Sequence, residues 1–179
     1  MPASDEELML AVRQGDLDAF EQLVERHQGA AWNAAWRFLG DAAEAEDVAQ
    51  QAFLNILEAA GRYEPSAKFT TYLYRIVTRL CIDHSRKKQP TYTDDLPARA
   101  APASSPAEAA EQRERDEAVR AAIATLPDRQ RMAVVLRYYE GLSGAEIAAA
   151  MATSAKAVER LLARGRACLE DELREWMAE

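Results

Sequence analysis

Residues 142–166 read LSGAEIAAAMATSAKAVERLLARGR, a pattern that predicts two helices joined by a tight turn. Ser143 is placed to cap the first helix, and Glu146 three residues later completes a capping box. Ser154 is placed to cap the second helix. Small and apolar residues between these caps would close an interior between the two helices: Ile147, Ala148, Met151, Val158 and Leu161. We therefore predict a helix-turn-helix.

The outward face of the second helix is basic, because Lys156, Arg160 and Arg164 recur at every fourth position. A helix of this kind fits the major groove of B-DNA and offers cations to phosphates and base edges. A helical hairpin whose basic face is merely solvated is the alternative interpretation of this segment alone.

The composition predicts an all-α protein. Alanine, leucine, glutamate and arginine dominate the 179 residues, and β-branched residues do not alternate over a useful length. This length allows one ordinary domain or two small helical domains.

Several function classes have little support. Cys81 and Cys168 lie far apart, and no cluster of Cys and His suggests a metal site. His27 and His84 are isolated, and neither a phosphate-binding glycine loop nor a catalytic constellation is visible, so we expect neither an enzyme nor a cofactor. No apolar run approaches the roughly 18 residues of a membrane span. Without an export signal, we expect a cytoplasmic protein that does not insert into membranes.

The net charge of −8 is unevenly distributed. Residues 62–90 hold seven Lys/Arg against two Asp/Glu, and residues 118–167 hold eight against four. The acidic residues are concentrated elsewhere, and 12 of them fall in residues 1–61. Since phosphate attraction is screened beyond roughly 10 Å, two basic segments on an acidic chain indicate two separate, weak DNA contacts.

Helix signals divide the chain into two parts. The first part, residues 1–89, contains predicted helices over residues 4–13, 17–38, 42–60 and 67–87. Residues 90–106 contain four of the seven prolines and form a predicted flexible linker. The second part, residues 107–179, begins with predicted helices over residues 107–124 and 127–139, with Pro127 in the first turn of the latter and Gly141 as its left-handed C-cap. The helix-turn-helix follows.

The predicted third helix carries a polar patch formed by Glu46, Asp47, Gln50 and Gln51. Its apolar face is predicted to contain Val48, Phe53, Leu54, Ile56 and Leu57. The patch is either a hydrogen-bonding surface for a partner or simply a solvated face.

Residues 62–79 combine aromatic and basic side chains. Tyr63, Phe69, Tyr72 and Tyr74 are interleaved with Arg62, Lys68, Arg75 and Arg79. Aromatic rings that stack on unpaired bases, beside cations that follow the backbone, suit single-stranded nucleic acid. The spacing also fits a buried helical stripe of Phe69, Tyr72, Leu73, Ile76 and Leu80. Both interpretations can hold together, with Phe69 and Tyr72 mostly inside and with four residues outside: Tyr63, Thr71, Arg75 and Arg79.

Three blocks in this order resemble bacterial extracytoplasmic-function (ECF) sigma factors. The first block is EDVAQQAF, residues 46–53. The second is FTTYLYRI, residues 69–76, followed by Asp83. The third joins LPDRQR, residues 126–131, to YYEGLSGAEIA, residues 138–148. The resemblance covers nearly the whole chain apart from the linker and the last few residues.

The resemblance implies a sigma region 2 domain over residues 1–89 and a sigma region 4 domain over residues 107–179. The polar patch, Glu46, Asp47, Gln50 and Gln51, would dock on a coiled coil of the largest subunits of core RNA polymerase. The −10 promoter element would be melted, and its single strand held, by Arg62, Tyr63, Lys68, Thr71, Arg75, Arg79 and Arg86. The −35 element would be read as a duplex by Ser154, Lys156, Arg160 and Arg164.

The resemblance also implies further partners. The second domain would bind the polymerase flap, and the linker would thread toward the RNA exit path. An anti-sigma factor is the expected regulator. No metal or cofactor is implied.

Five positions depart from the usual pattern of the family. Arg79 stands where many relatives carry Asn, Tyr72 where Trp is common, and Ala152-Thr153 replaces a Gly-apolar pair in the turn. Glu159 stands where Lys is frequent, and we expect it to pair with a neighbouring Arg rather than with a cytosine amino group.

Two other functions fit parts of the pattern. A stand-alone helix-turn-helix regulator would bind duplex DNA tightly without polymerase. A purely protein-binding helical adaptor would be insensitive to the loss of Arg160 and Arg164.

Overall fold

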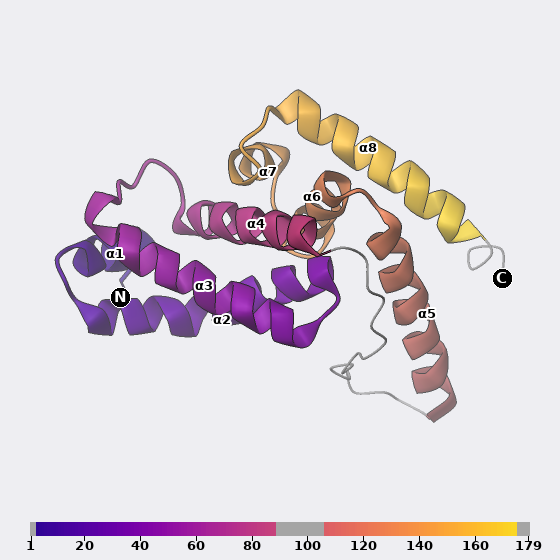
Figure 1. Cartoon of the computed structure of the whole chain (residues 1–179), viewed down its shortest axis with the longest axis horizontal. Coiled ribbons are helices and arrows are strands. Elements are labelled where there is room, and N and C mark those ends of the chain that lie inside the picture. Colours follow the sequence, from indigo (N-terminus) through magenta and orange to yellow (C-terminus); the bar gives the residue numbers. More distant parts are fainter. Residues whose placement is uncertain (1–2, 89–105, 175–179) are drawn as a thin grey trace.

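The computed structural model describes residues 3–88 and 106–174, and its regular structure there is entirely helical. Figure 1 shows the first four α-helices side by side and the last four grouped beyond them. The elements are α1 (Asp5–Arg13), α2 (Leu17–Leu39), α3 (Ala42–Ala59), the 3-10 turn η1 (Ala60–Arg62), α4 (Phe69–Lys87), α5 (Pro106–Thr125), α6 (Asp128–Tyr138), α7 (Gly144–Ala150) and α8 (Ala155–Glu172). The predicted all-α fold is therefore confirmed, whereas the predicted linker falls almost entirely outside the described residues.

Local capping signals set the boundaries of the first three helices, whereas α4 follows Lys68 without a side-chain cap. Ser4 and Glu7 form a reciprocal capping box at α1, and Asp16 accepts from the backbone of α2. Asp41 caps α3 in the same way, while Gly40 ends α2 in the left-handed region with φ 76°. These caps place the helices within two residues of the predicted bounds.

The helix-turn-helix is also formed as predicted. The Ser143 side chain accepts a hydrogen bond from the Glu146 backbone N–H, and the Glu146 carboxylate accepts one from the Ser143 backbone N–H, which completes the capping box. Ser154 caps α8 by accepting from the backbone of Ala157 at 3.2 Å. Two details of α6 differ from expectation: Pro127 occupies the N-cap rather than the first turn, and the left-handed Gly141 lies two residues beyond the C-cap.

Two backbone positions in the second half are tight. A Cβ at Gly165 of α8 would lie 2.9 Å from Val134 Cγ2 of α6, so a larger residue at this close helix crossing would force Val134 to shift. Ala152, in the turn between α7 and α8, has φ 49°, a region that favours glycine. The replacement of glycine by Ala152 therefore places strain in the turn.

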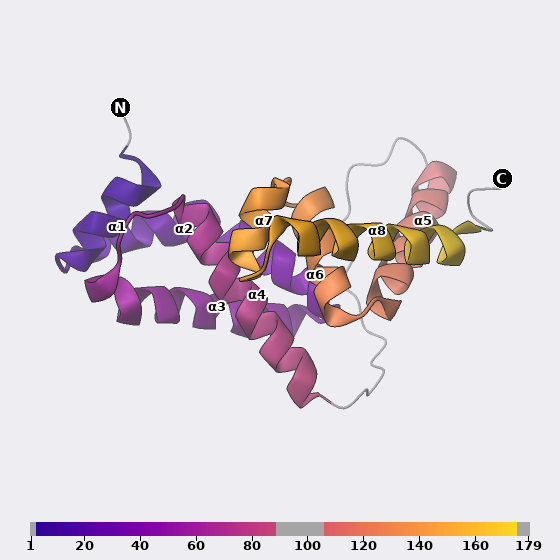
Figure 2. The same ribbon diagram turned by 90° about the horizontal axis from the view of Figure 1, so that it is seen from above.

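The two helical groups dock on each other. Helix α4 packs against α7 and α6, and α2 packs against α6 and α5. Figure 2 shows α7 lying over α4 when the molecule is seen from above. Residues of both groups, including Leu73 of α4 and Leu136 of α6, belong to one buried hydrophobic cluster. Sequence patterns did not predict this interface.

Arg131 of α6 joins both sides of the interface. Its guanidinium donates to the carbonyl of Phe38 at 3.0 Å and to those of Ala124 and Leu126 at 2.7 and 3.1 Å. The same group lies 5.1 Å from the centre of the Phe38 ring. Arg131 therefore ties the ends of α2 and α5 to the start of α6.

Among the described residues, no helix combines the length and apolarity needed to cross a bilayer. The same residues contain no cluster of acidic, His and Cys side chains suited to a metal ion.

Candidate functional site

A pocket of about 420 Å³ lies between η1, the loop that follows it, and the start of α4. Helix α7 contributes Ala149 to the wall. The remaining lining residues are Ala59, Arg62, Tyr63, Glu64, Ser66, Ala67, Thr71, Tyr72 and Arg75. Seven residues are predicted to hold the −10 strand, and four of them line this pocket: Arg62, Tyr63, Thr71 and Arg75. A fifth, Lys68, lies next to the pocket in the chain, between Ala67 and the start of α4.

The pocket places two aromatic rings beside two cations. The ring centres of Tyr63 and Tyr72 are 5.6 Å apart, with a tilted geometry. Arg62 and Arg75 are exposed at the edge. The Tyr63 hydroxyl is buried and has no hydrogen-bond partner among the described residues. Positive charge therefore lies beside the half-buried ring of Tyr72, a combination that suits an unpaired nucleotide, whereas the Tyr63 ring lies beneath the surface.

Burial dominates the chemistry of the two tyrosines. It raises the pKa of Tyr63, and Glu6 acts in the same direction. It also raises the pKa of Tyr72, against the opposing effect of Arg62 and Arg75. Both hydroxyls therefore stay neutral at physiological pH.

The expectation that Tyr63 and Thr71 point outward is wrong, since both are buried. The loop after η1 is held inward because Arg13 Nη1 donates to the Tyr63 carbonyl at 3.1 Å. Thr71 lies on the part of α4 that faces the same pocket as Ala149 of α7. Phe69 is buried and Tyr72 half-buried, while Arg75 and Arg79 are exposed, as expected.

The remaining cations of this surface differ in their partners. Lys68 Nζ lies 2.9 Å from Glu146 Oε1 of α7, and this contact raises the pKa of Lys68. Arg79 Nε lies 3.7 Å from Asp83 Oδ2 on the same helix. Arg86 is exposed near the end of α4, so the basic surface continues along the helix.

The predicted duplex-reading residues all lie on the exposed side of α8. Ser154, Lys156, Arg160 and Arg164 are exposed, whereas Val158 is buried. Glu159 is also exposed and makes no ion pair with the described residues around it, so the expected pairing with a neighbouring Arg is wrong.

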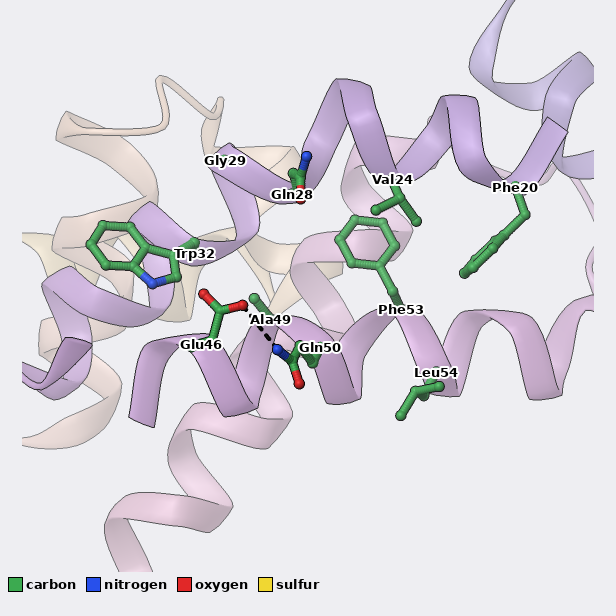
Figure 3. Close-up of a pocket in the computed structure, with 10 residues that line it drawn as sticks. All are labelled: Phe20, Val24, Gln28, Gly29, Trp32, Glu46, Ala49, Gln50, Phe53 and Leu54. Atoms are coloured by element: carbon green, nitrogen blue, oxygen red, sulfur yellow. Dashed lines mark hydrogen bonds between the residues drawn. The ribbon is translucent and has the colours of Figure 1, made fainter. Parts of the chain in front are cut away.

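The polar patch on α3 is exposed and borders a groove between α2 and α3. Glu46, Asp47, Gln50 and Gln51 are all exposed, and Gln50 Nε2 donates to Glu46 Oε1 at 2.9 Å. Figure 3 shows these two side chains at one end of the groove, which measures about 710 Å³. Its apolar lining comes from both helices: Phe20, Val24, Trp32, Ala49, Phe53 and Leu54.

Leu54 departs from its predicted place in the apolar core. It is 52% exposed, because α2 packs on the neighbouring face of α3 and leaves Leu54 at the groove edge. A single exposed leucine is ordinary on a protein surface, so the two interpretations of the polar patch, a partner surface and a solvated face, both stay open. The sequence alone could not show which turn of α3 the second helix leaves uncovered.

A third groove, which sequence patterns did not reveal, lies between α5, α6 and α8. Its volume is about 380 Å³. Most of its lining is apolar or aromatic: Val119, Ile123, Val134, Tyr138, Tyr139, Leu169 and Leu173, with Arg166 and Glu170 at the edge.

Comparisons with known proteins assign this arrangement to a class. The family model Sigma-70 region 2 matches residues 23–91, and Sigma-70, region 4 matches residues 116–169. The chain therefore contains the two conserved helical regions of bacterial sigma factors.

Full-length relatives narrow the class. The ECF RNA polymerase sigma factor SigW of Bacillus subtilis is 33% identical over 92% of this chain and 94% of its own length. The RNA polymerase sigma-H factor of Pseudomonas aeruginosa is 32% identical over 98% of this chain and 96% of its own length. The chain belongs to the ECF RNA polymerase sigma factors, which direct the start of transcription at promoters.

Solved structures agree with this assignment. CnrH, determined in complex with the cytosolic domain of CnrY, aligns over 97% of this chain and 99% of its own with a TM-score of 0.75 and 28% identity. The sigma factor RpoE of Bartonella quintana, in complex with the anti-sigma factor NepR, shares the fold with a TM-score of 0.70 and 18% identity over 87% of this chain and 96% of its own.

Proposed function

We propose that this ECF sigma factor divides promoter recognition between two surfaces of different geometry. The domain of residues 1–89 holds the melted −10 strand, and the domain of residues 107–179 reads the −35 duplex, with residues 90–106 as the tether. The observation that carries this proposal is the pairing of a recessed aromatic pocket on α4 with an open basic ridge on α8. A recess suits an extruded base, and a ridge suits a major groove.

The α2–α3 groove and its polar patch are the proposed docking site for core RNA polymerase. Glu46, Asp47, Gln50 and Gln51 supply hydrogen bonds, while Phe53 and Leu54 supply apolar contact. A helix of a coiled coil, apolar on one side and basic on the other, complements this surface. The apolar groove between α5, α6 and α8 is the corresponding proposed site for the polymerase flap.

Tethering explains how a chain of net charge −8 selects promoters. Each DNA contact is weak alone, but one polymerase that holds both domains raises the effective concentration of the second contact. The protein is proposed to act in the cytoplasm, as an initiation factor without an enzymatic step of its own. An anti-sigma factor is the proposed regulator, in line with the anti-sigma factor NepR that is bound to the structural relative RpoE.

Run-off transcription with purified core polymerase and a promoter library tests the proposal. The wild-type chain is expected to direct transcripts from a subset that shares −10 and −35 sequences. Glu46→Lys is expected to lower polymerase binding at least tenfold, because it places a cation against a basic partner. Glu58→Lys, an equal charge change at an exposed α3 position outside the groove, is the matched control.

Two results would contradict the proposal. Failure of the wild-type chain to join core polymerase would remove the initiation role. Tight, sequence-specific binding to duplex DNA without polymerase would favour the stand-alone regulator.

A further inference from the structure

Helix α1 belongs to none of the surfaces described above, yet it contacts the loop that lines the candidate −10 pocket. The family model of region 2 begins at residue 23, after α1 has ended. Helix α1 packs against α2, against η1 and against α4. Figure 1 and Figure 2 show it at the end of the first helical group where the loop after η1 leads into α4. The role of α1 is therefore to be sought in its contacts with this loop.

The first of these contacts caps α4. Lys68, at the N-cap position of α4, makes no side-chain capping bond. Instead, the backbone N–H of Phe69 donates to Glu6 Oε1 of α1 at 2.9 Å. The first backbone N–H groups of a helix lack partners within the helix and carry partial positive charge, so a carboxylate is favourable there. Glu6 thus supplies from another helix the cap that a local side chain supplies to α1, α2 and α3.

The second contact holds the opposite end of the same loop. Arg13 Nη1, in the last turn of α1, donates to the Tyr63 carbonyl at 3.1 Å. Residues 63–68 have no regular secondary structure, and four of them line the pocket: Tyr63, Glu64, Ser66 and Ala67. Glu6 and Arg13 lie two turns apart on one face of α1, about 10 Å along its axis. One short helix therefore fixes both ends of the segment.

Helix α1 is anchored well enough to serve as a fixed support. Its apolar side is buried: Leu8, Met9 and Val12. At its start, Asp5 lies 3.0 Å from Arg26 Nη1 and 2.7 Å from His27 Nε2, both on α2. The His27 ring packs against the Phe69 ring of α4, with the ring centres 5.2 Å apart. The beginnings of α1 and α4 therefore meet on the middle of α2.

The shape of the pocket depends on both contacts. The Tyr63 ring packs beneath the half-buried Tyr72 ring, and the Tyr63 backbone is the group that Arg13 holds. Thr71 and Tyr72 belong to the first turn of α4, which begins at the residue that Glu6 caps. Since an uncapped first turn frays, loss of the Glu6 acceptor would displace the pocket wall on the α4 side.

We propose that α1 is a positioning element for promoter opening: Glu6 caps α4 and Arg13 holds Tyr63, so that residues 63–68 keep the shape that selects and holds the −10 strand. This inference rests on the proposed −10 site. Neither positioning residue touches the strand itself. Because neither lines the α2–α3 groove or lies on α8, loss of either contact is expected to weaken base selection at −10 and to spare polymerase binding and −35 reading.

The test compares complexes of the full chain with core polymerase, purified and used at equal concentration. The templates are one promoter recovered from the run-off library and a set that carries each single-base substitution in its −10 element. Single-round run-off yield is measured on every template. The ratio of yields between the recovered and the substituted promoters is the base selectivity. A variant that merely reduces the amount of folded protein lowers all yields together and leaves this ratio unchanged.

Glu6→Ala removes the cap and is expected to lower the yield on the recovered promoter about fivefold and the selectivity about threefold or more. Glu6→Gln keeps an acceptor oxygen for Phe69 and is expected to retain selectivity within about twofold of wild type. Arg13→Ala is expected to lower selectivity by a factor similar to that of Glu6→Ala. Glu25→Ala and Arg115→Ala, at exposed positions of α2 and α5 outside the pocket and the α2–α3 groove, are the matched controls for charge.

A second measurement examines the contacts in the free chain. Amide hydrogen exchange is expected to become faster at Phe69 in Glu6→Ala and over residues 63–68 in both Glu6→Ala and Arg13→Ala. Exchange in the interior of α8 is expected to stay as in wild type, which shows that the variants remain folded.

Three results would overturn the inference. Glu6→Ala and Arg13→Ala retain wild-type selectivity; they lower the yield equally on every template; or exchange at Phe69 and in the loop is unaltered. A wild-type chain that directs no transcript from any template defeats the proposed function. Unchanged selectivity of the variants beside an active wild type defeats only the role of α1.

Discussion

Helices α4 and α8 both carry exposed cations and are nearly equal in length, at 19 and 18 residues, but they are embedded very differently. Helix α4 buries Phe69, Leu73, Tyr74, Val77 and Cys81 among other residues, whereas α8 buries only Val158 and Gly165. The comparison teaches that charge alone does not define a DNA-reading helix. Helix α4 can shape a pocket because the core fixes it, while α8 presents a ridge that a groove can surround.

The largest effect expected from this difference in burial is on the free energy of unfolding. Leu73→Ala on α4 is expected to lower the free energy of unfolding by about 2–5 kcal/mol, because Leu73 is fully buried and leaves a cavity. Leu162→Ala on the half-buried side of α8 is the matched truncation and is expected to cost less than half as much. Urea unfolding followed by circular dichroism measures both. Equal losses would mean that α8 is as deeply embedded as α4.

The same comparison predicts that the two helices discriminate between forms of DNA. Arg160→Ala is expected to weaken duplex binding by the polymerase-bound chain by about 1–3 kcal/mol and to reduce the salt dependence, through the loss of one cation on the ridge. Arg75→Ala is expected to spare closed duplex binding and to impair strand opening, detected by permanganate reactivity of unpaired thymines. Arg115→Ala, at an exposed α5 position, controls for general charge loss. Identical defects for Arg160→Ala and Arg75→Ala would contradict the division of labour.

Helix α8 crosses α6 closely at Gly165, on the side opposite its exposed cations. Gly165→Ala is expected to destabilise the chain by about 1–3 kcal/mol, because the new Cβ would meet Val134 Cγ2 at 2.9 Å. Val134→Ala removes that atom and is expected to recover part of the loss in the double variant. A double-mutant cycle by urea unfolding checks this coupling.

The parts of this molecule that the sequence predicts are those whose partners are close in the chain. Ser143 and Glu146 are three residues apart, and so are Ser4 and Glu7, so their caps are visible without a fold. Tyr74 and Glu140 are 66 residues apart, and Lys68 and Glu146 are 78. No spacing rule connects such pairs, so the interface between the domains emerges only from packing.

In the candidate surfaces, too, features set by neighbours in the chain are predictable, whereas features set by packing between distant segments are not. Cations of α8 were placed outward correctly by helical periodicity, because few neighbours cover that helix. Tyr63 was misplaced because its orientation depends on Arg13 of α1, which holds the loop inward. Leu54 was misplaced because periodicity identifies an apolar face but not how far the partner helix extends over it.

The turn before α8 offers a smaller test of the comparison. Ala152→Gly is expected to stabilise the helix-turn-helix by about 1 kcal/mol, because φ 49° is strained for alanine and free for glycine. Ala150→Gly, at the end of the preceding helix with no positive φ, is expected to destabilise instead. Thermal unfolding distinguishes the two signs. Destabilisation by Ala152→Gly would show that the turn relaxes in solution.

The smallest expected effect concerns the acid sensitivity of the capping box. Hydrogen bonding from the Ser143 backbone, followed by Lys68, lowers the pKa of Glu146 from its ordinary 4.5 to about 2. A depressed pKa in the folded state stabilises the fold above the ordinary pKa, and this stabilisation is lost as the pH falls from 4.5 toward 2. Because Glu146 is close to solvent, screening limits the effect to a few tenths of a kcal/mol.

Glu146→Gln keeps an acceptor for Ser143 but does not titrate. The difference in unfolding free energy between wild type and Glu146→Gln is therefore expected to be largest near pH 6 and to shrink below pH 4.5. Repeating the measurement in a Lys68→Ala background separates the two contributions, since this variant removes the contact with Lys68 and leaves the Ser143 cap. A difference that persists unchanged in the Lys68→Ala chain assigns the whole effect to the cap, and a difference that disappears assigns it to the contact with Lys68.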